Sequence, residues 1–260
     1  MKIASWNVNS LRTRMGHVLA WWDAHQPDVL LLQETKVADE MFPRAPFEER
    51  GLHVAIHGQK SYNGVAIVSR HPLGDVEQGF HGDVFADHAR LIAATVAHPK
   101  GNLRVASAYV PNGESTQSPK FVFKEEFYAH LTAWAAREVA AFPQLVVGGD
   151  FNISADERDV DNPAKRSKEC MFTSAERGWL QTFAGDHLHD ALRLTTDEAG
   201  LFSWWDYRSY AFVNNRGMRI DYLFVSDALK AKVANVTHYR DERGKEQPSD
   251  HIPIEVELAL

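Results

Sequence analysis

The stretch 145–152, Leu-Val-Val-Gly-Gly-Asp-Phe-Asn, is the feature that most constrains the fold of this chain. Its short apolar run reaches two glycines, which is typical of a buried strand whose end approaches other backbone. Asp150 and Asn152 then follow the strand, at the edge where α/β proteins bind ligands. Side chains alternate along extended backbone, so both point the same way. The pair could hold a phosphate oxygen and a water, or form an Asx turn that closes the strand.

Further strands are predicted from apolar runs and from alternating patterns with turn residues at both ends. The run at 29–32 is uninterrupted, as expected for a strand buried on both faces. The short strands between 54 and 96 are separated by Gly, Asn and Pro turns, which favours antiparallel pairing. The predicted strands cover residues 2–7, 29–32, 54–57, 65–69, 91–96, 103–110, 219–225 and 254–258.

Helices are predicted between these strands. One follows Ser10, a plausible N-cap, a long amphipathic helix covers 121–141, and a third begins near Thr173 or Ser174. The polar loop 156–169 is expected to be irregular. The order is strand, helix, strand, a meander, then strand, helix, strand again. Two similar halves of this kind suit two packed sheets with helices outside them.

Composition sets broad limits on the class of protein. The chain has 260 residues, 44% of them hydrophobic, and no linker or repeat divides it, so we expect one domain over residues 1–260. Its single cysteine, Cys170, cannot form an internal disulfide, and its first residues lack the apolar region of a signal peptide, so we expect a cytoplasmic protein. The net charge of −7 argues against a generally basic DNA coat but permits a local basic groove.

Several common motifs are missing from the sequence, and their absence narrows the cofactor. There is no G-x-x-x-x-G-K-[ST] or G-x-G-x-x-G stretch, so no nucleotide cofactor is expected. There is no Cys/His cluster or H-E-x-x-H helix, which argues against zinc. No window is long and apolar enough to span a membrane, so no membrane partner is expected.

Eight polar groups lie where the predicted strands begin or end. Each alone is more simply explained as a structural residue. Together they supply what phosphodiester hydrolysis requires, namely oxygen ligands for a hard cation, a base for water and a donor to the phosphate. They are Asn7, Glu34, Tyr109, Asp150, Asn152, Asp221, Asp250 and His251.

Glu34 is the best single candidate for a metal ligand, because Mg²⁺ takes only one or two protein carboxylates and keeps several waters. Asn7 could help to orient it. Asp150 is predicted to position or deprotonate the attacking water, and Asn152 to bind a phosphate oxygen.

His251 is predicted to form a dyad with Asp221. The histidine would donate to the scissile phosphate, and the carboxylate would fix its tautomer and raise its pKa. The alternative is a buried histidine satisfied by a backbone carbonyl. Whether Tyr109 or Asp150 handles the proton stays open.

Six ordered motifs carry a resemblance that covers essentially the whole chain. They are Ser5 to Arg12, Leu32 to Lys36, Tyr62 to Ala66, Gly149 to Ile153, Arg219 to Tyr222, and Ser249 to His251. In this order they resemble the exonuclease III family of endonuclease/exonuclease/phosphatase enzymes.

The resemblance implies a fold, a cofactor and a set of roles. The fold would be a four-layer α/β sandwich, with two packed mixed β-sheets flanked by helices. The enzyme would be a monomer that hydrolyses DNA phosphoester bonds with Mg²⁺ or Mn²⁺. The eight polar groups would form its active site, with Asn7, Glu34 and Asp250 at the metal. Asp250 would be an outer ligand of the metal or would hydrogen-bond to a residue that binds it.

Two further sets of residues are candidates for DNA contacts. Arg90, Asn112, Lys120 and Lys124 lie near motif-bearing strand ends and could grip phosphates, although solvated surface charge would explain them equally well. Trp204, Trp205 and Met218 match the apolar pocket that receives the sugar at a lesion in the resembled family.

The sequence departs from the family pattern at two positions of this pocket. Trp205 stands where Phe is more usual, and Met171 stands where members that cut at abasic sites have Ser or Gly. The extra side-chain volume should make the binding of a flipped abasic sugar less favourable by about 1–3 kcal/mol. We therefore predict a DNA-repair 3′→5′ exonuclease and 3′-phosphatase acting on duplex DNA with 3′ ends, nicks or gaps, with weak or absent abasic-site cleavage.

Three alternatives remain. The chain could be a full abasic-site endonuclease of the same family. The same phosphoesterase core could act on phosphoinositides or sphingomyelin. A non-catalytic DNA-binding module would keep the fold, but the complete set of carboxylates, Asn152 and His251 argues against it.

Overall fold

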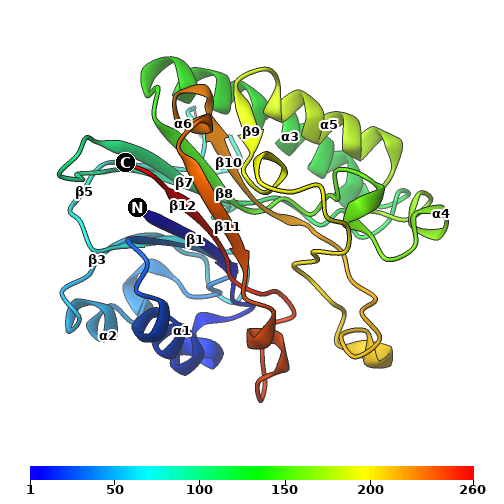
Figure 1. The fold of residues 1–260 in the computed structure, drawn as a ribbon, viewed down its shortest axis with the longest axis horizontal. Coiled ribbons are helices and arrows are strands. Elements are labelled where there is room, and N and C mark those ends of the chain that lie inside the picture. Colours follow the sequence, from blue (N-terminus) through cyan, green and yellow to red (C-terminus); the bar gives the residue numbers. More distant parts are fainter. Residues whose placement is uncertain (83) are drawn as a thin grey trace.

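The computed structural model describes residues 1–82 and 84–260, and they fold around two six-stranded sheets (Figure 1). The first sheet has the order β11-β12-β1-β2-β4-β3, formed by Val233–His238, Ile254–Leu258, Lys2–Asn7, Val29–Gln33, Val65–Ser69 and His53–His57. The second has the order β5-β6-β7-β8-β10-β9, formed by Leu73–Gln78, Leu91–Val96, Leu103–Tyr109, Leu145–Asp150, Asp221–Ser226 and Leu188–Asp190.

The two sheets share one pattern of strand pairing. β1 and β2 run parallel in the first sheet, as β7 and β8 do in the second, and the other neighbours run antiparallel. Both sheets are therefore mixed, and the predicted two similar halves are present in the topology.

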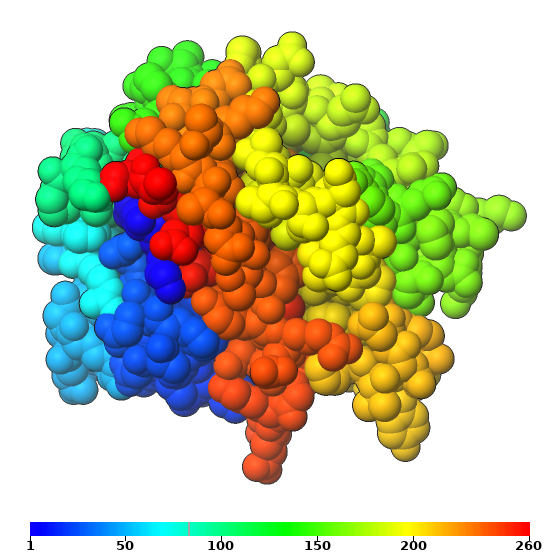
Figure 2. All heavy atoms as spheres, viewed as in Figure 1, coloured from blue at the N-terminus to red at the C-terminus, as the bar shows by residue number. Residues whose placement is uncertain are grey.

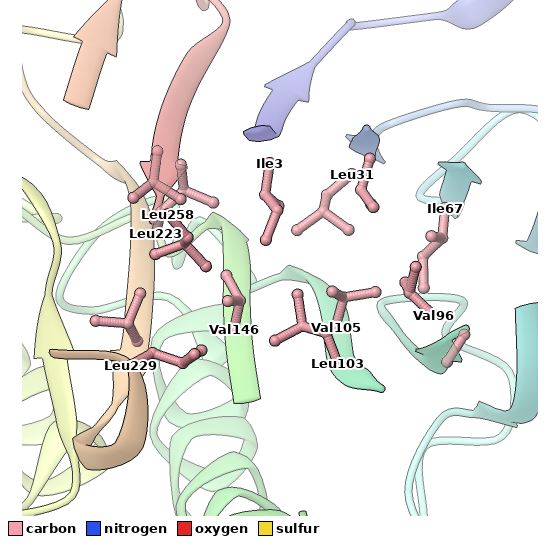
Figure 3. Packing of buried hydrophobic residues seen from close by; sticks show 14 of the residues in the cluster. Ile3, Leu31, Ile67, Val96, Leu103, Val105, Val146, Leu223, Leu229 and Leu258 are labelled. Atoms are coloured by element: carbon pink, nitrogen blue, oxygen red, sulfur yellow. The ribbon is translucent and has the colours of Figure 1, made fainter. Parts of the chain in front are cut away.

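Apolar side chains of both sheets fill the space between them (Figure 3). Ile3 and Leu31 of the first sheet belong to the same buried cluster as Val105, Val146 and Leu223 of the second. This shared core is compatible with a single domain over residues 1–260. The single domain itself stays a prediction.

Helices cover the outer face of each sheet, which completes the predicted four layers (Figure 1). Trp21 and Trp22 of α1 pack on the first sheet, and Phe127 and Leu131 of α3 pack on the second. The α-helices are α1 Leu11–His25, α2 Ala45–Glu48, α3 Pro119–Ala141, α4 Pro163–Arg166, α5 Ser174–Ala184 and α6 Asp227–Lys230. The 3₁₀ turns are η1 Asp39–Met41, η2 Glu157–Asp159, η3 Leu192–Leu194, η4 Arg208–Tyr210 and η5 Arg240–Gly244.

Some elements differ from the sequence predictions. β5 and β11 carry no long apolar run because they are edge strands with mostly exposed or half-exposed residues. Ser10 precedes α1, but its backbone has φ 92° and its side chain makes no cap hydrogen bond. The loop predicted over 156–169 contains η2 and α4, each started by a side-chain cap. The strand predicted over 219–225 begins two residues later, at Asp221.

Two segments stand out from the body of the molecule. They contain η4 and η5 and form separate projections in the space-filling view (Figure 2). Within the part of the chain that the structure describes, none of the helices has the length and apolar character needed to cross a membrane.

Gly149 allows β8 to lie close to β7, and replacing it tests the central pairing. Its φ is +154°, and an added Cβ would lie 1.9 Å from the carbonyl oxygen of Ala108. Gly149→Ala should therefore lower the free energy of unfolding by about 3 kcal/mol. Gly178→Ala in α5 is the control, since its Cβ would meet nothing within 4 Å, and it should raise stability by about 0.5–1 kcal/mol. Equal denaturant midpoints for the two variants would contradict this account.

Candidate active site

Sheet pairing brings the polar strand ends together. Asp150, the last residue of β8, is paired with Tyr109 at the end of β7 and with Asp221 at the start of β10. In the first sheet, Asn7 at the end of β1 is paired with Gln33, directly before Glu34. The packing of the two sheets places both edges around one site.

His251 and Asp221 form the predicted dyad. The imidazole Nδ1 lies 2.9 Å from Asp221 Oδ2, and Ser203 Oγ donates to the same carboxylate oxygen at 2.6 Å. Because a carboxylate only accepts, Nδ1 carries a proton, and Nε2 faces Asp150 Oδ2 at 3.7 Å. Burial by itself would lower the pKa of His251, but the Asp221 and Asp150 carboxylates outweigh it and raise the pKa to about 10.

Asp150 lies at the centre of the site and is 1% exposed. Its Oδ1 accepts from the backbone N–H of Asn152 at 2.9 Å, and its Oδ2 accepts from Asn7 Nδ2 at 3.0 Å. Burial raises the pKa of Asp150 to about 7, although the His251 imidazolium opposes the shift. The carboxyl can therefore exchange a proton near neutral pH.

Tyr109 differs from Asp150 in its acid–base state. Burial and the nearby Glu34 carboxylate raise the pKa of Tyr109 well above its usual range. The Arg90 guanidinium lies 4.6 Å from the centre of the tyrosine ring. A phenol that stays protonated is a poor base at neutral pH, so the raised pKa of Tyr109 favours Asp150 for proton transfer.

Asn7 joins the carboxylates of the two sheets. Its Nδ2 donates to Glu34 Oε1 at 2.9 Å as well as to Asp150, and its Oδ1 accepts from the Asn9 backbone N–H at 3.0 Å. The N–H of Asn9 can only donate, which fixes the orientation of the Asn7 amide. Asn7 thus positions both carboxylates, and its oxygen is already engaged rather than free for a metal.

Glu34 is held next to a cation of the chain. Its Oε2 lies 2.8 Å from Lys36 Nζ. Burial alone would raise the pKa of Glu34, but Lys36 and the Asn7 hydrogen bond lower it. The carboxylate is therefore ionised and suited to a neighbouring positive charge.

Asn152 is fixed by the loops around it. Its Nδ2 donates to the Val110 carbonyl at 2.9 Å, and its Oδ1 accepts from Asn112 Nδ2 at 3.0 Å. The second N–H of the amide is left for a phosphate oxygen. Asn112 Nδ2 also lies 3.4 Å from Met171 Sδ, so one amide contacts both residues.

Asp250 links the site to Trp204. Its Oδ1 accepts from Asn9 Nδ2, and its Oδ2 accepts from the Trp204 indole N–H, each at 3.0 Å. Both oxygens are engaged within the protein, so Asp250 fits the outer role better than direct ligation.

These residues surround a cavity of about 180 Å³. It is small and mostly polar, with Met171, Trp204 and Ile220 as its apolar wall. Its lining is Glu34, Tyr109, Asn112, Asp150, Asn152, Met171, Trp204, Ile220, Asp250 and His251.

A larger cavity of about 630 Å³ adjoins it and shares Tyr109 and Asn112 with it. Arg90 and Lys120, two of the cations predicted to contact phosphates, line this second cavity. The Lys120 side chain is 70% exposed and pairs with Glu114. Both positions are compatible with contacts to a DNA backbone.

Lys124 is where the structure contradicts a predicted phosphate contact. Its side chain is 0% exposed, and its ammonium lies 2.6 Å from a Glu176 carboxylate oxygen. A cation buried and paired in this way cannot reach a phosphate on the surface. No local sequence pattern predicts this ion pair, because Glu176 lies on a different helix.

Two of the predicted pocket residues also need correction. Trp205 is 1% exposed and packs with Phe202 and Phe212 in a separate cluster, so it does not narrow the cavity. Met218 is 0% exposed and packs in a cluster with Trp204 and Met171, behind the cavity wall. Of the two adjacent tryptophans, only Trp204 faces the site, since alternate side chains of extended backbone point to opposite sides.

Three further residues hold the carboxylates of the site, and these contacts were not predicted. Asn9 and Lys36 hold Asp250 and Glu34, and Ser203 holds Asp221. Asn9 and Lys36 each lie two residues after a predicted site residue, which is a signal that could have found them. Ser203 lies among aromatic residues, and only the fold brings it to Asp221.

The donor set fits a hard divalent cation. Among the described residues, Glu34, Asp150 and His251 form one group whose ligand atoms lie within 4.8 Å of one another. Because both nitrogens of the His251 imidazolium carry protons, the possible metal ligands of the group are its carboxylate oxygens, which Mg²⁺ and Mn²⁺ prefer.

The two-sheet sandwich and its buried carboxylates, amides and imidazole define a hydrolase of the endonuclease/exonuclease/phosphatase class. The model of the endonuclease/exonuclease/phosphatase family matches residues 4–251, and the chain belongs to this family. The resemblance seen in the sequence is thereby confirmed.

Individual relatives are similar over their full length. Exodeoxyribonuclease III of Haemophilus influenzae is 39% identical, with 99% of this chain and 100% of the relative covered. The structure of a Neisseria 3′ phosphatase bound to a product DNA hairpin matches with a TM-score of 0.96 and 39% identity, covering 100% of both chains. An AP endonuclease from Archaeoglobus fulgidus matches with a TM-score of 0.94 and 31% identity, again covering 100% of both.

The Asp221 carboxylate should control the charge of His251. Replacing it in Asp221→Asn removes the nearer negative charge, so the pKa of His251 should fall from about 10. The measurement is an NMR titration of the imidazole in the metal-free protein. As a control, Asp227→Asn changes an exposed carboxylate that pairs with His187 and His189. An unchanged His251 titration in Asp221→Asn would contradict the dyad.

Proposed function

We propose that this protein is a divalent-metal-dependent DNA-repair phosphodiesterase that acts on duplex DNA at 3′ ends, nicks and gaps. It removes nucleotides in the 3′→5′ direction and 3′-phosphate groups, and it cleaves internal abasic sites poorly. The observation that carries the proposal is the buried dyad of His251 and Asp221, which faces Asp150 and Asn152 across one small cavity.

Asp150 prepares the attacking water. Its carboxylate is fixed by Asn7 and by the backbone of Asn152, so it keeps one orientation. A pKa raised to about 7 allows it to accept the proton of the water near neutral pH. Tyr109, whose phenol stays neutral, donates to the substrate instead.

His251 and Asn152 stabilise the charge that develops on the phosphate. The imidazolium Nε2–H is free of the Asp221 contact and points toward Asp150, where a phosphate oxygen can reach it. The Asn152 amide adds its remaining N–H. Donors fixed in advance in a buried site stabilise a transition state more than flexible donors in water do.

Glu34 is the group that would hold the divalent cation, with water completing its shell, and Asp250 would act from outside through water. Bound there, Mg²⁺ or Mn²⁺ would act as a Lewis acid on a phosphate oxygen. Oxygen ligands suit both ions, and we propose either as the cofactor.

Met171 is the basis for the proposed selectivity. It lines the cavity, and its backbone has φ +78°. A side chain at this wall takes up space that a flipped abasic sugar would need. Trp205 does not contribute to this selectivity, because it lies outside the cavity.

Cleavage at abasic sites is the second candidate function. The similarity to the Archaeoglobus fulgidus AP endonuclease at 31% identity favours it. The 39% identity to the Neisseria 3′ phosphatase favours the first proposal. A lipid phosphoesterase receives less support, because the relatives named above are described as nucleases or as bound to DNA.

The proposed DNA-binding surface includes Arg90, Asn112 and Lys120 beside the cleavage cavity. Trp204 lines the cleavage cavity, where it would contact the sugar at the 3′ end. We propose that the protein acts as a monomer in the cytoplasm.

Nuclease assays on a duplex with a recessed 3′ end test the proposal. Mg²⁺ or Mn²⁺ should support degradation, and EDTA should abolish it. His251→Ala and Asp150→Asn should each lower kcat by about 10²–10⁴-fold, because each removes a group that acts on the reacting atoms. His187→Ala is the matched control at an exposed histidine and should keep full activity. Full activity in EDTA, or in His251→Ala, would refute the mechanism.

Met171→Gly tests the selectivity. Glycine adopts φ +78° without strain, so the variant should fold, and the cleared wall should raise abasic-site cleavage by about 10-fold or more. The measurement is the ratio of kcat/KM on an internal abasic duplex to kcat/KM on a recessed 3′ end. If the wild-type enzyme uses both substrates equally well, or the ratio is the same in the variant, Met171 is not the barrier.

A further inference from the structure

A buried ion pair connects the two helices that cover the second sheet. Lys124 of α3 and Glu176 of α5 are both 0% exposed, and their charged atoms lie 2.6 Å apart. The Lys124 ammonium also donates to the carbonyl oxygens of Asn152 at 2.7 Å and Asn112 at 3.1 Å. Its three protons thus have three acceptors, two of which are backbone groups of residues that line the cleavage cavity.

Glu176 also holds a second residue of the cavity lining, Met171. Its Oε1 accepts from the backbone N–H of Met171 at 2.8 Å, and its Oε2 accepts from the N–H and the hydroxyl of Thr173. The Met171 carbonyl in turn accepts from the Ser154 N–H at 2.8 Å. Both peptide groups of Met171 are therefore fixed, and one of them depends on Glu176.

We propose that Lys124 and Glu176 are positioning residues that set substrate selectivity. The pair fixes the distance between Asn152, which binds the phosphate, and Met171, which narrows the cavity. This inference rests on the proposed function, because it assigns a cause to the selectivity for 3′ ends.

Backbone strain at both ends of the network makes its support necessary. Asn152 has φ 51° and Met171 has φ 78°, in the left-handed region. This region is unfavourable for a side chain such as methionine, so Met171 keeps it only while surrounding contacts hold it there. Without the Glu176 carboxylate, the segment around Met171 would relax, and its side chain would withdraw from the wall.

The test is a double variant that removes both charges and the acceptor for the Met171 N–H, Lys124→Met with Glu176→Leu, so that no buried charge is left alone. The matched control is Arg104→Met with Glu138→Leu. That pair is also buried, with 2.7 Å between its charged atoms, and Glu138 lies on the same helix α3. Its contacts are to Asp75, Glu77 and Arg137 rather than to the cavity lining.

Both double variants are assayed on an internal abasic duplex and on a recessed 3′ end. The Lys124/Glu176 variant should shift the ratio of kcat/KM values toward the abasic substrate by about 10-fold. The control should lose stability without a shift. A ratio that is unchanged in the first variant, or equally changed in both, would overturn the proposal.

A double-mutant cycle identifies Met171 as the route. In a Met171→Gly background, removing the ion pair should not change the ratio further, since the wall is already cleared. A full additional shift would show that the pair acts elsewhere and would overturn the assignment.

A second variant covers the case in which the double variant does not fold. If the double variant does not fold by circular dichroism, Thr173→Val weakens the hold on Glu176 without removing a charge and should shift the ratio in the same direction. A folded Thr173→Val with an unchanged ratio would then overturn the proposal. Absence of metal-dependent activity on any DNA in the wild-type protein would instead refute the proposed function, which separates the two failures.

Discussion

The contact between the Asp150 carboxylate and its neighbours is the constraint on which the rest of the site depends. A carboxylate that is 1% exposed is costly to bury, and here it lies close to a second carboxylate, Asp221. The amide of Asn7, the backbone of Asn152 and the imidazolium of His251 compensate for that cost. The same arrangement that makes the charge tolerable leaves Asp150 able to exchange a proton and His251 able to donate one. Stability and chemistry therefore share one set of contacts.

The pairing of two similar sheets explains why these groups meet. Each sheet has one parallel pair, β1 with β2 and β7 with β8, and both pairs end at the site. Gly148 permits close packing between the sheets, since a Cβ there would lie 2.7 Å from Leu31 of the first sheet. Ligands of the proposed cation, the base and the dyad thus come from both halves, and neither half contains a complete site.

The proposed selectivity depends on a different layer of the molecule. Met171 reaches the cavity from the segment before α5, and its position depends on Glu176 and Lys124, which lie on the covering helices. Changes in that layer can alter which DNA end fits while the carboxylates and the imidazole stay in place. This separation is consistent with a family whose members share a fold and include both a 3′ phosphatase and an AP endonuclease.

The sequence by itself determined the two-sheet α/β class, most of the strands and the polar residues at their ends. Apolar runs that stop at Asn7, Asp150 and Glu34 are local patterns, and the ordered motifs identified the family. Only the tertiary structure decided that Lys124 and Trp205 are buried away from the substrate, because burial depends on which residues from distant elements pack against a side chain. It also brought Ser203 to Asp221 and Glu176 to Met171. Contacts between residues far apart in the chain leave no local pattern, so a single sequence cannot reveal them.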